Sequence, residues 1–365
     1  MAAKRTGISY DLLFHPGETI GEILIERGIS QAELAVSTGV SAAYVSNIIS
    51  GKKDISANFA MALEYALRIP KSFWLNLQAN YDAELLELNE TASVTETELC
   101  LCDTLKDIIR YLRQHHLLPT KENGPALVLS LRKALQVSNL ENLKDLAYTG
   151  AFRLSVAGSQ TDPYILGAWV RLCQLTEHEL PEGSCFSATK IDSLVTSLKK
   201  IMCDNHPNFI EELKETLCTY GIDFSVVKNF RGAPVQGYIS QKSNNTYRMV
   251  LTIRGAYADI FWFSLFHELG HVINGDISKA SKFIDAGTDP DKERAADFFA
   301  SSCLLQPQDY ASFIQQKNYS FSAIEQFALS QHVMPYIVIG RLQKEGILNY
   351  NTFSDYKLRY KWNNA

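Results

Sequence analysis

Two histidines and a glutamate stand close together in an otherwise apolar stretch, FWFSLFHELGHVING at residues 261–275. His267 and His271 are four positions apart, about 40° of rotation and about 6 Å of rise on an α-helix, so both imidazoles leave the same face. Two such imidazoles can hold one Zn²⁺ ion without bending the backbone. Glu268 would lie beside this metal rather than on it, where a carboxylate can act as general base toward water. The stretch therefore predicts a buried helix whose polar groups are satisfied by a cation.

A zinc site needs a third protein ligand, and a suitable carboxylate follows in DKERAADFFASSCLL, residues 291–305. The pattern predicts a helix with Glu293 near its start and Asp297 one turn later on the same face. This spacing suits Glu293 as the third ligand and Asp297 as the acceptor for the spare ring N–H of a ligating histidine, which we expect to be His271. The order of these residues is that of a gluzincin.

Other residues around the motif leave alternatives open. Asp276 and Asp285 are rival carboxylate ligands, in a segment whose glycine and serine content predicts a loop. Tyr257 and His332 could stabilise an oxyanion, although ordinary packing is the favoured interpretation of both. Residues 248–254 could supply a strand edge to which an extended peptide adds, or an inner strand that is paired on both sides.

The elements that would position this site are three strands and the helices that follow them. The β-branched and aromatic segments IDFSVVKNF, VQGYISQ and YRMVLTIRG lie between residue 222 and residue 255, with turn signals between them. Residues 101–220 show helical periodicity throughout and carry no catalytic constellation. We therefore predict a helical middle domain at 101–220 and a metallopeptidase domain with a small sheet at 221–365. The overall class is a multidomain α and α+β chain.

A different pattern occupies the first part of the chain, where short helices alternate with breaking residues. Ser30, Ser41 and Ser56 are placed as N-caps, and Gly39 and Gly51 as stops. The segment ISQAELAVSTGVSAAYVSNIISGK, residues 29–52, fits a helix-turn-helix with Val40, Val45 and Ile48 packing inward. Residues 1–82 are predicted to form this domain, and the acidic residues 83–100 a helix end and an exposed linker or a solvated helix face.

Six residues of this head are candidates for contact with DNA. Alanines open the second helix of the motif, and an alanine can meet only a thymine methyl group. Residues 1–80 hold seven basic and seven acidic side chains, so counterion release would be modest. The candidates for phosphate contact are Gln31, Lys52 and Lys53, and those for base contact are Tyr44, Ser46 and Asn47. A head kept for dimerisation or for holding a protein partner is the alternative.

The C-terminal motifs resemble the ImmA/IrrE family of zinc metallopeptidases. DIFWFSLFHELGHVINGD followed by KERAADFFA matches the family pattern of H-E-x-x-H and then E-x-x-A-[ND]-x-F-A, and VMPYIVIGRLQKEG at 333–346 is similar to the family's C-terminal part. The likeness covers about 220–350. It implies zinc ligands at His267, His271 and Glu293 with Glu268 as the base, and cleavage of a protein, classically a helix-turn-helix repressor. Asp297 stands where many members have Asn.

The N-terminal region resembles the XRE/HigA-type antitoxin head, over residues 15–82, including IPKSFWLNLQANYD at 69–82. The two resemblances together imply a bacterial DNA-binding regulator, of a toxin–antitoxin, stress-response or phage-defence kind, that carries a zinc-dependent endopeptidase. We expect a homodimer, because such heads read two half-sites. The substrate would be a protein partner, such as a repressor or toxin, or the chain itself.

Two rival hypotheses stay open. One is a DNA-binding antitoxin or repressor whose peptidase-like domain senses or binds a partner without turnover, and the other is a peptidase whose head is an adaptor.

Composition excludes few classes of function: the 365 residues carry a net charge of −5, so any DNA contact must be local. Seven cysteines without a C-x-x-C pair argue against a disulfide framework. No apolar stretch of membrane-spanning length is present, and we expect a cytoplasmic protein.

Overall fold

The computed structural model describes residues 13–147, 151–154, 161–243, 245–277 and 289–362. Backbone contacts divide the chain into two compact units. The first unit comprises Met1–Leu99 with Glu122–Leu129, and the second comprises Cys100–Lys121 with Ser130–Ala365. Among the described residues, no helix is both long enough and apolar enough to cross a membrane.

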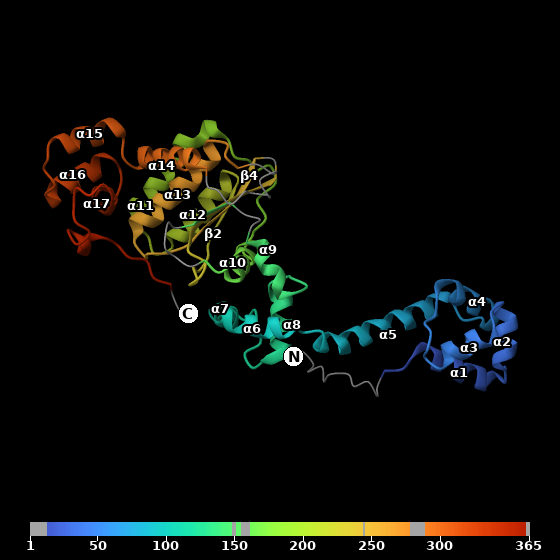
Figure 1. The fold of residues 1–365 in the computed structure, drawn as a ribbon. Coiled ribbons are helices and arrows are strands. Elements are labelled where there is room, and N and C mark those ends of the chain that lie inside the picture. Colours follow the sequence, from blue (N-terminus) through green and yellow to red (C-terminus); the bar gives the residue numbers. More distant parts are fainter. Residues whose placement is uncertain (1–12, 148–150, 155–160, 244, 278–288, 363–365) are drawn as a thin grey trace. The chain divides into compact units, whose positions relative to one another are not determined.

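The first unit begins with a helical head, in which α2, α3 and α4 begin directly after the predicted caps (Figure 1). Its helices are α1 (Pro16–Arg27), α2 (Gln31–Thr38), α3 (Ala42–Ile49), α4 (Ala57–Leu67) and α5 (Lys71–Ala92). Ser30, Ser41 and Ser56 each accept a hydrogen bond from a backbone N–H of the first turn, which confirms the three predicted caps. Gly39 ends α2 with a φ of 69°, a conformation that glycine adopts without steric cost.

The head has its own apolar core, formed by the inward faces of these helices. Val45 and Ile48 of α3 are buried in it, and Val40 packs against it, as predicted. Gly17 of α1 lies so close to α3 that an added Cβ would sit 1.8 Å from the carbonyl oxygen of Ile48. The first and third helices can therefore cross closely only because position 17 lacks a side chain.

The acidic stretch 83–100 is almost entirely helical, which agrees with the helix-face alternative and shows that the exposed-linker alternative is wrong. α5 continues to Ala92, and α6 (Glu96–Thr104) starts after three residues. The Thr95 hydroxyl accepts from the Glu98 N–H at 3.2 Å, and the Glu98 carboxylate faces the Thr95 N–H at 3.4 Å. This reciprocal pair is a capping box. It was not predicted, because the polar and acidic residues around it are also typical of a linker.

The second unit contains the remaining elements, and its first part is mainly helical. The helices are α7 (Lys106–Gln114), α8 (Gly124–Ala134), which spans the unit boundary, α9 (Leu143–Leu146), α10 (Pro163–Leu175), α11 (Ile191–Asp204) and α12 (Phe209–Thr219). Short 3₁₀ turns lie at Leu140–Asn142, Ala188–Lys190 and Ser354–Tyr356. The prediction of an entirely helical 101–220 is wrong at β1 (Ala151–Leu154), because pairing with a distant strand, which local periodicity does not reveal, makes this segment extended.

A four-stranded sheet of order β1-β3-β4-β2 forms the centre of the second unit. β2 (Ile222–Val226), β3 (Val235–Ser243) and β4 (Thr246–Leu251) are the three strands predicted from the sequence. β3 is antiparallel to both β1 and β4, whereas β2 is parallel to β4. β4 is paired on both sides, so residues 248–251 are an inner strand and do not offer a free edge for a peptide.

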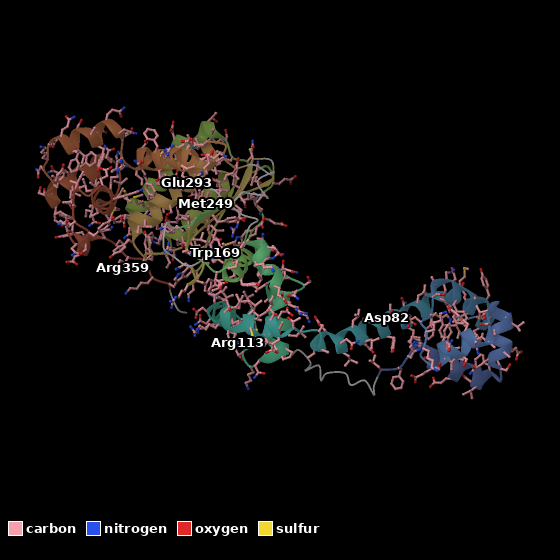
Figure 2. All side chains as sticks on the ribbon, in the orientation of Figure 1. Asp82, Arg113, Trp169, Met249, Glu293 and Arg359 are labelled. Carbon is pink, nitrogen blue, oxygen red and sulfur yellow. The ribbon has the colours of Figure 1, made fainter. Side chains whose placement is uncertain are left out.

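The two faces of the sheet bury different chemistry. Phe224, Ile239 and Met249 lie on the face that packs in the core with α13 (Ala258–Ile273), the helix of the histidine motif. Figure 2 labels Met249 among the side chains of this unit. On the other face the buried Arg248 guanidinium forms an ion pair with Asp223 at 3.0 Å. Burying charges is costly unless they are paired and hydrogen-bonded, and the two Nη atoms of Arg248 meet that condition.

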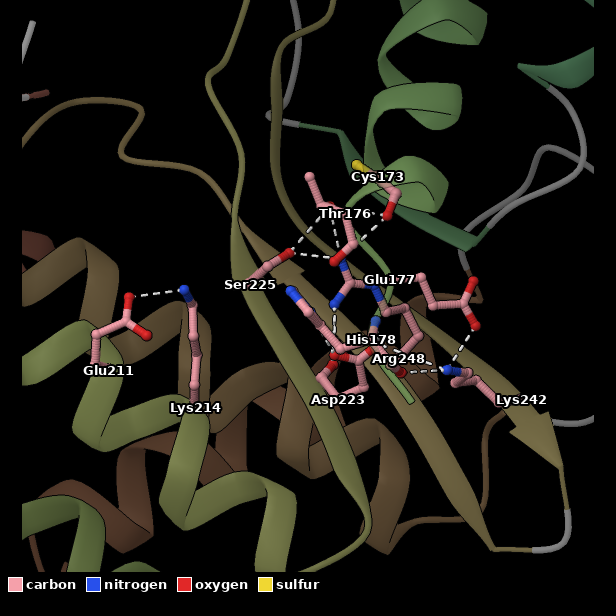
Figure 3. A network of polar contacts seen from close by, with 10 residues as sticks. All are labelled: Cys173, Thr176, Glu177, His178, Glu211, Lys214, Asp223, Ser225, Lys242 and Arg248. Carbon is pink, nitrogen blue, oxygen red and sulfur yellow. Dashed lines mark hydrogen bonds and ion pairs between the residues drawn. The ribbon is translucent and has the colours of Figure 1, made fainter. Parts of the chain in front are cut away.

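The Arg248 network ties α10 to the sheet (Figure 3). Arg248 Nη2 donates to the Thr176 hydroxyl at 2.7 Å and to the carbonyl of Cys173 at 3.1 Å, at the C-terminal end of α10. The Ser225 hydroxyl of β2 also accepts from it. Helix ends leave backbone carbonyls without intrahelical partners, and the guanidinium satisfies them here.

The C-terminal part of the chain is again helical. α14 (Pro290–Leu304), α15 (Pro307–Gln315), α16 (Phe321–Ser330) and α17 (Pro335–Lys344) follow α13. α13 makes its most extensive helix contacts with α14 and also packs on α17, β3 and β4. The buried faces of these elements share one apolar core, which fixes α13 and α14 side by side (Figure 1).

Candidate metal centre and helix-turn-helix head

Three ligand atoms from α13 and α14 converge at one point in the second unit. The Nε2 atoms of His267 and His271 are 3.0 Å apart, and the Glu293 carboxylate oxygens lie 3.4 Å and 3.5 Å from them. Both histidines are on the same face of α13, as their spacing predicts. His267 is fully buried, whereas the Glu293 side chain is 29% exposed. The structure thus brings together the three residues predicted as ligands.

Each histidine is oriented by a carboxylate on its other ring nitrogen. Asp297 Oδ1 is 2.8 Å from His267 Nδ1, and Asp276 Oδ2 is 2.9 Å from His271 Nδ1. The predicted pairing of Asp297 with His271 is therefore wrong: Asp297 faces the histidine one turn earlier on α13. Asp276, considered above as a rival ligand, lies just beyond the end of α13 and holds the second imidazole instead.

These contacts fix which atoms the centre presents to a ligand. Ionised carboxylates only accept hydrogen bonds, so each aspartate takes the Nδ1–H of its histidine and leaves the Nε2 lone pair directed at the convergence point. Two imidazole lone pairs and a carboxylate then face one another, an arrangement that a cation between them stabilises. Ligands about 2.0–2.1 Å from a tetrahedral zinc lie about 3.3–3.4 Å apart, close to the observed separations. The donor set fits Zn²⁺.

The Glu268 side chain lies between α13 and the sheet, against Gly237 of β3. This glycine was not among the residues predicted from the sequence. The glutamate is 2% exposed. A Cβ added to Gly237 of β3 would lie 2.1 Å from Glu268 Oε1, so any larger residue at position 237 would displace the carboxylate. A glycine inside a strand often marks such a close approach, which is the signal that could have identified it.

A second glycine allows α13 and α14 to approach closely. An added Cβ at Gly270 would lie 2.9 Å from the Cα atom of Ala296. Ala296 is itself fully buried, so two small residues meet where the helices cross. This contact keeps Glu293 of α14 within reach of the histidines of α13.

A cavity of about 510 Å³ opens beside the centre, between α13, α14 and α17. Asp297 and Ser264 line it on the side of the histidines, and Asp259 and Lys357 line it at the start of α13. Burial raises the pKa of Asp259, while its ion pair with Lys357 at 2.7 Å partly offsets this rise. The cavity is therefore lined both by Asp297, which contacts His267, and by the Asp259–Lys357 ion pair.

The remaining alternatives lie away from the convergence point or outside the described residues. Asp285 is outside the described residues. Tyr257 precedes α13 and carries Lys357 and Arg359 against its ring, which supports the packing interpretation. His332 lies in the turn after α16, where its carbonyl accepts from the Cys203 thiol.

The predicted DNA-contact residues all lie on the helix-turn-helix or directly after it. Gln31 opens α2, Ser46 and Asn47 lie on α3, and Lys52 and Lys53 follow α3, and these five are exposed. Tyr44 differs, because it is only partly exposed, with its ring edge-on to Phe59 and Lys53 Nζ 4.4 Å from its centre. The ring is therefore partly engaged in the head's own packing.

Comparison with known proteins identifies the head. Residues 20–74 match the family model HTH_3, described as helix-turn-helix. The virulence-associated protein A' of Dichelobacter nodosus is 44% identical over 69 residues, which are 19% of this chain and 60% of that protein. The chain therefore spans less than two thirds of the length of this curated relative.

Solved structures of antitoxins are similar over a comparable part of the chain. The antitoxin GraA is 35% identical and covers 23% of this chain and 96% of its own, with a TM-score of 0.22. The Pseudomonas aeruginosa antitoxin HigA, solved with the higBA promoter, is 34% identical and covers 23% and 97%, with a TM-score of 0.21. A HigA-family antidote protein of Coxiella burnetii is 30% identical, covers 23% and 96%, and has a TM-score of 0.21. By the family match, residues 20–74 of this chain form a helix-turn-helix of the HTH_3 family.

Proposed function

We propose that this chain is a DNA-binding, antitoxin-like or repressor-like regulator that carries a zinc-dependent endopeptidase. The observation that carries the enzymatic part is the convergence of His267, His271 and Glu293, with a carboxylate behind each imidazole. A carboxylate that accepts the other ring N–H of a ligating histidine orients that histidine and strengthens metal binding. The motif H-E-x-x-H and the resemblance to ImmA/IrrE peptidases favour the same reading.

The neighbouring residues suit hydrolysis of a peptide bond. Zinc, when bound, would supply a Lewis acid that polarises a carbonyl and makes water more acidic. The buried Glu268 carboxylate, held in place against Gly237, can take a proton from the attacking water and pass it to the leaving nitrogen. Buried apolar neighbours such as Leu265 and Phe266 keep the helix rigid and the carboxylate poorly solvated.

For the head, we infer binding to an operator in DNA. The family match and the exposure of Ser46 and Asn47 on α3 support base contact, and Lys52 and Lys53 are placed for phosphate contact. A dimer would present two such helices to two half-sites. The peptidase would then act on a protein partner, such as a repressor or toxin, or on the chain itself.

The proposal is tested by metal content and cleavage together. Purified chain should bind one equivalent of zinc by mass spectrometry, and Glu293→Ala should lose most of it while the circular dichroism spectrum stays unchanged. Glu268→Gln should keep the zinc but slow the cleavage of fluorescent casein by about 10²-fold or more, because it removes the general base.

Two other outcomes would point elsewhere. A zinc-loaded chain that cleaves neither casein nor itself, and is unaffected by Glu268→Gln, would favour a domain that binds a partner without turnover. A chain that refuses zinc when it is offered would remove the metal centre altogether.

A further inference from the structure

β3 is the strand that Glu268 approaches, at Gly237, and β1, from a distant part of the chain, covers the outer side of β3. Gly237 contacts the Glu268 carboxylate and is also the register partner of Arg153 in β1. Neighbouring strands lie about 4.8 Å apart, so any segment that pairs with the outer side of β3 passes one strand spacing from Gly237, which lies against Glu268. The opposite edge of the sheet is β2, which pairs with β4 alone.

The strand that covers this edge is short and irregular. β1 contains four residues, and its register against β3 shifts between Arg153 and Leu154. A strand of this length makes few ladder hydrogen bonds, whereas β3 itself runs over nine residues and pairs with β4 along most of them. β1 is therefore the strand of this sheet that a competing polypeptide could displace most easily.

We propose that the edge of β3 from Val235 to Ile239 is a docking site for an extended polypeptide, and that Ala151–Leu154 fills it as an internal blocking strand. This inference rests on the proposed function, since it says how a protein substrate of the same site would bind. A substrate segment would replace β1 and pair antiparallel with β3, the strand whose Gly237 lies against the Glu268 carboxylate of α13. Recognition through main-chain hydrogen bonds selects an extended, unfolded segment rather than one particular side chain.

The test disrupts β1 in the full-length, zinc-loaded protein. Successive residues of a strand point their N–H groups to opposite sides, so Phe152→Pro/Arg153→Pro removes a ladder donor whichever residue faces β3. Phe152→Ala/Arg153→Ala is the matched control, because it keeps both N–H groups. Hydrogen exchange of residues 235–241 measures the covering of the edge, and the exchange of α13 checks that the fold is intact.

The expected result has three parts. The proline variant should exchange the amides of 235–241 faster than the alanine control and should cleave fluorescent casein at least tenfold faster than wild type. A synthetic peptide with the sequence of residues 149–156 should restore slow exchange and suppress the added cleavage. Unchanged exchange in the proline variant, or faster exchange that the peptide does not reverse, would overturn the proposal. Cleavage of the zinc-loaded wild type within 151–154 would also overturn it, because β1 would then be a substrate and not a block.

Failure of the proposed function gives a different pattern. The same exchange experiment in the Glu268→Gln background requires no turnover. Restoration of slow exchange by the peptide there, with no casein cleavage by the wild type or by the proline variant, would leave the docking edge standing and remove the peptidase.

Discussion

At the scale of residues, the candidate metal centre depends as much on the carboxylates that contact the histidines as on the histidines themselves. Asp297 and Asp276 each accept an Nδ1–H and so hold both imidazoles with Nε2 toward Glu293. Without such an acceptor a ring can rotate or change tautomer, and the lone pair no longer points at the ion. Metal affinity should therefore depend on two side chains that never touch the metal.

Replacement of either aspartate by the isosteric amide should weaken zinc binding. Asp297→Asn and Asp276→Asn each remove the negative charge that raises the basicity of the ligating imidazole, so we expect zinc affinity to fall by about 10–100-fold. Competition with a chromophoric chelator measures this affinity directly. Both side chains are at least partly accessible, at 41% and 11% exposure, so the fold should tolerate the change.

Asp291→Asn is the matched control, because Asp291 lies on the same helix as Asp297 but pairs with Arg294 at an exposed position. Its zinc affinity should equal that of the wild type. Equal affinities for all three variants would mean that the aspartates do not orient the histidines toward a metal.

The sequence predicts which three side chains converge, and it predicts their surroundings less well. The shared face of His267 and His271 follows from their helical spacing, a local property, whereas Glu293 is predicted from the E-x-x-x-D pattern of the next helix. The partner of Asp297 depends on the rotation of α14 against α13, and the position of Asp276 depends on how the chain leaves α13. Gly237 matters through contact with a residue thirty-one positions later, so a glycine within a predicted strand indicates a close approach there but not which residue approaches.

At the scale of elements, the centre depends on one helix crossing. The two histidines belong to α13 and the glutamate to α14, so the separation of these helices sets the distance between ligands. Gly270 and Ala296 meet at the crossing, where the backbone of Ala296 leaves no room for a Cβ on Gly270. Backbone cannot rotate away as a long side chain can, so a methyl group at this position must move a helix.

Gly270→Ala should therefore lower both stability and zinc affinity. Overpacking of a close crossing costs about 1–3 kcal/mol, more than the roughly 1 kcal/mol by which alanine favours a helix over glycine. Urea unfolding of the zinc-free protein measures the stability, and chelator competition measures the affinity, which should fall at least tenfold. Gly21→Ala in α1 is the control, since its Cβ would meet only Ile49 at an ordinary 3.4 Å. A Gly270→Ala protein with wild-type zinc affinity would contradict this account of the crossing.

The elements themselves differ in how far the sequence determines them. The caps at Ser30, Ser41 and Ser56 and the three strands from Ile222 onward rest on local signals and are confirmed. β1 rests on pairing with β3, which is non-local, and its four residues carry no alternation that could have revealed it. The capping box of Thr95 and Glu98 was present in the sequence, but the acidic composition around it favoured a linker.

At the scale of the whole molecule, the chain combines a helix-turn-helix head with a candidate hydrolase, and the head carries no excess of positive charge. Seven basic and seven acidic residues lie within residues 1–80, so DNA affinity must come from how the few cations are placed. Lys52 and Lys53 both lie exposed directly after α3. Each phosphate that such a lysine neutralises contributes about 0.9 to the slope of log affinity against log salt.

Lys52→Gln/Lys53→Gln should therefore reduce this slope by about 1–2 on DNA from the promoter of the chain's own gene. Fluorescence anisotropy between 50 and 200 mM salt measures the slope, and the loss of affinity should be similar on operator and random DNA, because phosphate contacts carry no sequence information. Lys71→Gln is the control, because Lys71 lies on α5 and pairs with Glu64 at 3.4 Å. Asn47→Ala should act in the opposite manner, weakening operator binding by about 1–3 kcal/mol while leaving random DNA nearly unchanged. Equal slopes in the wild type and the double variant would show that Lys52 and Lys53 do not neutralise DNA phosphates.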